Sequence, residues 1–71
     1  MKRKSVSSAT MSSVGYDRNK KILEIQFSSG DIYHYFNVPY KVYDRLMNAS
    51  SHGQYFNIHI KDAGFHFEKI T

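Results

Sequence analysis

The sequence predicts one small α+β domain, in which an antiparallel sheet with β-β-β-α-α-β order carries two helices on one face. Apolar and polar residues alternate over 23–27, a turn and a third strand over 31–37 follow, a helical stripe comes after Pro39, and alternation returns over 65–68. A chain of 71 residues has room for one hydrophobic core, and 41% hydrophobic residues is too high for a disordered segment.

The first residues are expected to stand apart from that domain. Residues 1–12 begin with Lys2, Arg3 and Lys4 and continue with hydroxyl side chains and little apolar periodicity. We therefore expect a flexible basic arm over 1–12 and a folded domain over 13–71. These three cations supply most of the formal net charge of +4, so the folded body is nearly neutral.

A hairpin is the first predicted unit of the domain. Val14 and Tyr16 alternate with smaller partners, and residues 17–20 then offer the turn chemistry of Asp-Arg-Asn-Lys. The strand that follows places Leu23, Ile25 and Phe27 on one face, as a half-buried strand should.

The Ser28-Ser29-Gly30 loop decides which face of the third strand is buried. A three-residue loop pairs Phe27 with Asp31 and sets Glu24 opposite His34. A two- or four-residue loop would bury His34 instead, and its ring nitrogens would then need a buried partner. We favour the first register. It makes core residues of Tyr33 and Tyr35 and leaves on the outer face Ile22, Ile32 and Phe36.

Two helices and a closing strand complete the prediction. Pro39 suits a first helical turn, and an apolar stripe follows it at Val42, Tyr43, Leu46 and Met47. Ser51 and Gln54 have the spacing of a capping box, so a second helix should run to about Lys61. Phe65 and Phe67 then alternate with polar residues as a strand.

A set of short motifs spans nearly the whole chain. The most specific is Tyr33-x-Tyr35 followed by Val38-Pro39. Others are Val14-Gly15-Tyr16-Asp17, Leu23-x-Ile25-x-Phe27, Ala49-x-Ser51-x-Gly53 and Tyr55-Phe56-Asn57. Together they resemble the KTSC domain family, a module at the C-terminus of some lysyl-tRNA synthetases that also occurs as a stand-alone bacterial or phage protein. The resemblance implies no established activity, but its synthetase context implies an RNA-binding role.

Catalytic and metal chemistry find little support in the sequence. Cysteine is absent, and none of the four histidines has a partner at i+3 or i+4. His52 and His59, seven residues apart, would make an acid/base pair only if the second helix extends back that far. No nucleophile elbow or glycine-rich phosphate loop occurs. We expect no enzyme, no metal and no cofactor.

The longest apolar runs are too short to span a membrane, and no apolar signal core follows the first cations. We therefore expect a cytoplasmic protein that does not associate with membranes.

The start of the second helix is the predicted phosphate site. Ser51, His52 and Gly53 would present backbone N–H groups there, and glycine permits close approach of a ligand or of another chain segment. The alternative is that Ser51 and Gln54 satisfy these donors and Gly53 fits beneath a core aromatic. Further phosphate contacts are predicted at Lys2, Arg3 and Lys4 of the basic arm and at Lys41, Arg45 and Lys61.

Two functions follow from these residues. The first is a non-catalytic accessory module that binds RNA, tRNA-like or single-stranded, weakly through phosphate contacts. The alternative is protein–protein interaction or homodimerisation through the outer face formed by Ile22, Ile32 and Phe36.

Overall fold

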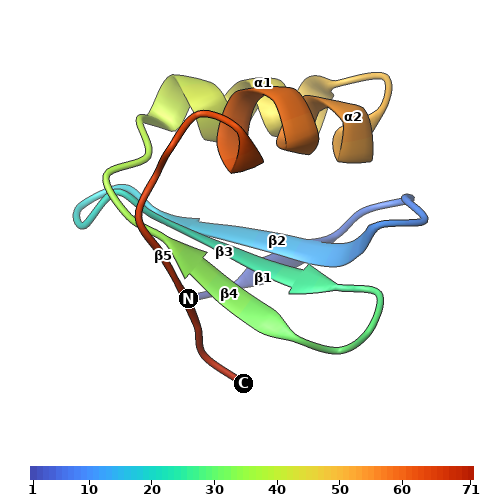
Figure 1. Cartoon of the computed structure of the whole chain (residues 1–71), viewed down its shortest axis with the longest axis horizontal. Coiled ribbons are helices and arrows are strands. Elements are labelled where there is room, and N and C mark those ends of the chain that lie inside the picture. Colours follow the sequence, from blue (N-terminus) through green and yellow to red (C-terminus); the bar gives the residue numbers. More distant parts are fainter.

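The computed structural model describes residues 1–71 as two layers, an antiparallel sheet and the helices that cover one of its faces (Figure 1). The sheet has the order β1-β2-β3-β4-β5. Its strands are β1 (Arg3–Ser5), β2 (Met11–Asp17), β3 (Ile22–Phe27), β4 (Ile32–Tyr35) and β5 (Phe67–Lys69). The helices are α1 (Tyr40–Asn48) and α2 (His52–Phe56), and α2 continues into a π-helical segment, η1 (Asn57–Lys61).

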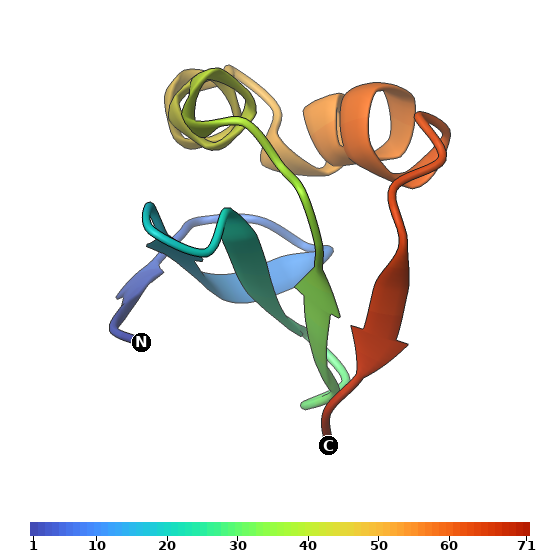
Figure 2. The same cartoon turned by 90° about the vertical axis from the view of Figure 1, so that its left-hand side faces the viewer.

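The predicted α+β class and the packing of both helices on one face are confirmed (Figure 2). The element order has one strand more than predicted, β-β-β-β-α-α-β, because β1 pairs with β2 at the edge of the sheet.

Residues 3–5 belong to the segment 1–12 that was expected to be a flexible arm, but in the structure they form strand β1. Arg3 pairs with Gly15, and Ser5 pairs with Ser13. Met11, also within the expected arm, is fully buried and begins β2. β1 is exposed along its whole length, so its sequence has no apolar alternation that would reveal it. Its Arg3 and Lys4 suit an edge strand, where charge discourages pairing with other chains.

The predicted register between β3 and β4 is confirmed. Glu24 lies opposite His34, and Ile25 lies opposite Tyr33. The Phe27 N–H donates to the Asp31 carbonyl oxygen at 2.8 Å, as the three-residue loop requires. Gly30 has a φ of +97°, a left-handed conformation that glycine adopts without steric cost.

The core lies between the sheet and the helices. Tyr35 is 6% exposed and belongs to it, whereas Tyr33 is half-buried and packs at its edge. The other buried hydrophobic residues of the core are Met11, Val14, Leu23, Ile25, Val38, Leu46, Phe56 and Ile60.

The second helix begins where the capping box predicts. Oγ of Ser51 accepts a hydrogen bond from the Gln54 N–H at 3.3 Å. The helical path then continues to Lys61, as expected, although its last five residues are π-helical.

Candidate nucleic-acid interface

Hydrogen bonds link strand β2 and the turn between β2 and β3 to Val38, which lies just before α1. The Val38 N–H donates to the Lys21 carbonyl oxygen at 3.0 Å, and the Tyr16 hydroxyl donates to the Val38 carbonyl oxygen. In the turn itself, Oδ1 of Asp17 accepts from the N–H groups of Asn19 and Lys20 at 3.0 and 3.1 Å. Such an Asx turn fixes the path of the loop. The side chains of the turn are therefore presented beside α1.

Aromatic rings join these two segments. Tyr16 on β2 stacks on Tyr43 of α1 with ring centroids 5.0 Å apart and planes at 12°. Tyr40 packs against Tyr16 at 5.9 Å, and the Arg18 guanidinium lies 4.1 Å from the centroid of the Tyr40 ring. Burial raises the pKa of Tyr16, which keeps its hydroxyl protonated as the donor to Val38. The result is a stacked array that ends in an exposed guanidinium.

The two segments that these contacts join carry several exposed cations, and we call this set of side chains the basic surface. It comprises Tyr40 and five exposed cations, Arg18, Lys20, Lys21, Lys41 and Arg45. The carboxylates on the same two segments are Asp17, held in the turn, and Asp44, whose Oδ1 accepts from Nδ2 of Asn48 at 3.3 Å. None of the five cations forms an ion pair within the chain. Their charge is therefore available to an anionic partner.

The three N-terminal cations that the sequence singles out lie in different settings at β1. Because Arg3 pairs with Gly15 in an antiparallel ladder, Lys2 lies alongside Tyr16, toward the β2–β3 turn. Lys2 and Lys4 are exposed and form no ion pair. Arg3 instead points to the uncovered face of the sheet and is engaged there.

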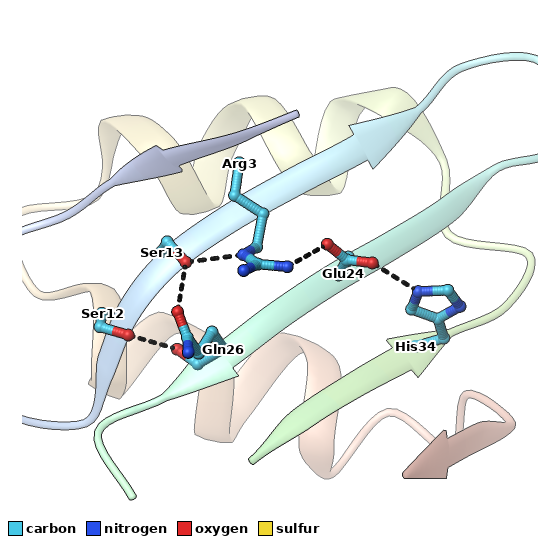
Figure 3. A network of polar contacts seen from close by, with 6 residues as sticks. All are labelled: Arg3, Ser12, Ser13, Glu24, Gln26 and His34. Atoms are coloured by element: carbon cyan, nitrogen blue, oxygen red, sulfur yellow. Dashed lines mark hydrogen bonds and ion pairs between the residues drawn. The ribbon is translucent and has the colours of Figure 1, made fainter. Parts of the chain in front are cut away.

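That uncovered face carries a polar network across four strands, β1 to β4 (Figure 3). Nη1 of Arg3 lies 2.6 Å from Oε2 of Glu24, and Nε2 of His34 lies 2.7 Å from Oε1 of Glu24. Nε of Arg3 also donates to Ser13 at 2.9 Å. Burial alone would raise the pKa of Glu24, but the hydrogen bonds from His34 and Arg3, together with their charges, lower it overall. The ionised Glu24 carboxylate therefore engages Arg3, whose charge is not free for a phosphate.

The predicted phosphate site at the start of α2 lies in a different place. Residues 7–10 and 50–54 enclose a polar hollow there. A Cβ atom on Gly53 would lie 2.7 Å from Oγ1 of Thr10, so a chain segment already occupies the space that glycine leaves. Nδ1 of His52 lies 2.8 Å from the Leu46 carbonyl oxygen, and Ser51 caps the Gln54 N–H. These contacts give Ser51, His52 and Gly53 structural roles without a ligand.

The structure therefore brings together only some of the predicted phosphate contacts. Lys41 and Arg45 belong to the basic surface, with Lys2 beside it, whereas Lys61 lies at the end of η1. Sequence reasoning missed Arg18, Lys20 and Lys21. Their signal was a turn with cations at three of its four positions from 18 to 21, but only the fold shows that this turn meets α1.

The structure shows no arrangement of side chains suited to a metal site or to an acid/base pair of histidines. No three histidine, aspartate or glutamate side chains lie close enough together to hold a metal ion. His59 packs against Tyr55 with ring centroids 4.4 Å apart, and His52 is bound to the end of α1, so the two histidines serve separate contacts. No helix has both the length and the apolar character required to cross a bilayer.

Comparison with known proteins places these features in one family. The KTSC domain model matches residues 7–65. A protein of Stutzerimonas stutzeri described as uncharacterized is 40% identical over 70 residues, 99% of both chains. A lysine–tRNA ligase of Nostoc punctiforme is 45% identical over 56 residues, which are 79% of this chain and 10% of the ligase. The crystal structure of a KTSC domain protein from Yersinia pestis matches with a TM-score of 0.94 and 38% identity, over 99% of this chain and 97% of that one.

Proposed function

Because the chain belongs to the KTSC domain family, relatives of which include segments of lysine–tRNA ligases, we propose that it is a non-catalytic module that binds single-stranded RNA through the basic surface. The observation that carries the proposal is the Arg18–Tyr40 contact, which joins the cationic turn to the cationic helix.

The basic surface has the two components that single-stranded RNA requires. Its unpaired cations attract phosphates, and the release of counterions from the RNA makes that attraction sensitive to salt. Unstacked bases pack on aromatic rings or on guanidinium planes. Arg18 covers one side of Tyr40 and is itself exposed, so its outer plane is open to a base.

The distribution of unpaired charges also supports RNA binding at this surface rather than elsewhere on the molecule. Elsewhere the ionisable groups are largely paired: Arg3 and His34 with Glu24, Lys69 with Asp31, and His66 with Glu68. The lysines outside the basic surface that form no ion pair are Lys2, Lys4 and the single Lys61, so a polyanion is attracted mainly to the basic surface and to the neighbouring Lys2 and Lys4. With few phosphate contacts the affinity is modest.

The test is a titration of labelled protein with a short single-stranded RNA at about 50 mM salt, followed by amide chemical shifts. We expect shifts at residues 17–21 and 39–45. Lys20→Glu and Lys41→Glu should each weaken binding about tenfold. Lys69→Glu carries the same change of charge at a distant exposed lysine and should have a much smaller effect.

The proposal fails if RNA moves no amides of the turn or of α1, or if Lys69→Glu weakens binding as much as Lys20→Glu does. Far-ultraviolet circular dichroism and the amide spectrum of each variant verify that it is folded. A helical tRNA in place of the single strand tests the strand preference, since its bases are largely stacked and closed.

A second candidate function is association through the uncovered face of the sheet. Ile22, Ile32 and Phe36 are half-buried there, and no helix covers them. A second copy of the chain or another protein would bury these side chains. Sedimentation equilibrium tests self-association: a dimer that Ile32→Lys dissociates would support this candidate, whereas a monomer at high concentration would oppose self-association.

A further inference from the structure

An aromatic cleft of about 350 Å³ opens at the other end of β3 from the basic surface. The turn between β3 and β4, strands β4 and β5, and the end of η1 surround it. Among the residues that line it are Phe27, Tyr33, Tyr35, Phe67, Ser29 and Lys61. Its volume lies at the lower end of the range for small-molecule sites.

The walls of the cleft are rings that the helices leave partly uncovered. Phe67 pairs with Tyr35 across β4 and β5, so its side chain lies on the face that the helices cover. It nevertheless remains 55% exposed. Its ring centroid lies 5.7 Å from that of Tyr35 and 6.0 Å from that of Tyr33. A flat ligand would bury the exposed part of Phe67 against these rings.

The cleft also offers a tyrosine hydroxyl that no protein atom binds, and the Ser29 hydroxyl, which accepts only a 3.4 Å hydrogen bond from the Asp31 N–H. Tyr35 is 6% exposed, yet its hydroxyl, unlike that of Tyr16, forms no hydrogen bond within the chain. Since no buried side-chain oxygen lacks a partner, this hydroxyl must reach solvent, and the cleft that Tyr35 lines provides the opening. Burial and the neighbouring Tyr33 raise the pKa of Tyr35 to about 12, so the hydroxyl is a donor at neutral pH.

The rim of the cleft carries a free positive charge. Lys61 forms no ion pair, whereas the Asp31 carboxylate is engaged by Nζ of Lys69 at 3.6 Å. A ligand that combines a flat ring, hydrogen-bonding groups on the ring edge and a negative charge is therefore complementary to the site.

We propose that this cleft binds one nucleotide, with the base packed on Tyr33 and Phe67 and the phosphate near Lys61. The base edge would hydrogen-bond with the Tyr35 and Ser29 hydroxyls. A free mononucleotide and an unpaired nucleotide of an RNA strand share this chemistry. The proposal goes beyond RNA binding at the basic surface, because a free mononucleotide needs no contact with that surface.

The experiment is a chemical-shift titration with adenosine 5′-monophosphate, and in parallel with adenosine, inorganic phosphate and a short single-stranded RNA. We expect the monophosphate to shift amides of residues 27–35, 61 and 67, with adenosine and phosphate each binding more weakly. Phe67→Ala should weaken binding about tenfold by removing a stacking surface. Ile58→Ala is the matched control, since Ile58 is 54% exposed and does not line the cleft.

Each outcome decides the proposal. Shifts with the monophosphate that Phe67→Ala reduces and Ile58→Ala does not would support it, with a free nucleotide as the ligand. The same pattern with RNA alone would support it, with a strand as the source. No shift around the cleft in either titration, or shifts that Phe67→Ala leaves unchanged, would overturn it. Lys20→Glu should not affect binding of the monophosphate, so failure here is distinguishable from failure at the basic surface.

Discussion

Glu24 and His34 face each other across the β3–β4 ladder, with Oε1 and Nε2 2.7 Å apart on the uncovered face of the sheet. The other carboxylate oxygen of Glu24 binds Arg3, so one side chain joins β4 to the edge strand β1. Its pKa is lowered because these hydrogen bonds and charges outweigh the effect of burial.

Glu24→Gln should therefore destabilise the fold at neutral pH by roughly 2 kcal/mol, the usual worth of hydrogen bonds to a charged group. A carboxyl whose pKa is lower in the folded state stabilises it above the unfolded value, and that contribution disappears as pH falls through the folded pKa. The difference in unfolding free energy between the two proteins should shrink from pH 7 toward pH 3. Denaturant unfolding at each pH measures it, and a difference independent of pH would contradict this role of Glu24.

Gly15→Ala should detach β1 from the sheet. A Cβ atom at this position would lie 2.6 Å from the Lys2 carbonyl oxygen, a backbone atom that cannot move aside without breaking the pairing of Arg3 with Gly15. Faster amide hydrogen exchange over residues 3–5, with protection kept in β3 and β4, is the expected result. Unchanged exchange in β1 would show that the close approach at Gly15 is not required.

The two tyrosines of β4 should differ in their contribution to stability. Tyr35 is 6% exposed, so Tyr35→Ala removes a core ring and should cost about 3 kcal/mol. Tyr33 is half-buried at the edge of the aromatic cleft, and Tyr33→Ala should cost less. Thermal unfolding of both variants tests this order, and the reverse order would mean that Tyr33 carries the core packing.

Much of the sheet could be predicted because local signals decide it. The Ser28-Ser29-Gly30 loop fixes the register of β4, and alternation marks which residues of β3 face the core. β1 has no such signal: both of its faces are exposed, and its place depends on Gly15 and Glu24, which are distant in sequence. Because β1 lacks such a signal, the sequence predicts a flexible arm where the structure has a strand.

The candidate sites were harder to predict than the strands. Lys41 and Arg45 were found on a recognisable helix, but their association with Arg18 depends on the contact of Tyr16 with Tyr40 and Tyr43, between segments more than twenty residues apart. Gly53 was predicted to allow close approach of a ligand or of another chain segment, and only the fold shows that the neighbouring segment contains Thr10. Which side chains share a surface depends on contacts between segments that are distant in sequence. The periodicity of apolar residues does not predict those contacts.

The dependence of single-stranded RNA affinity on salt tests the central claim most directly. If the five cations of the basic surface each contact one phosphate, the logarithm of the association constant should fall against the logarithm of salt concentration with a slope of about −3.5. Lys20→Gln and Lys41→Gln should each make the slope shallower by about 0.7, and Lys69→Gln should leave it unchanged. A slope near zero, or a slope that Lys20→Gln and Lys41→Gln do not alter, would contradict RNA binding at this surface.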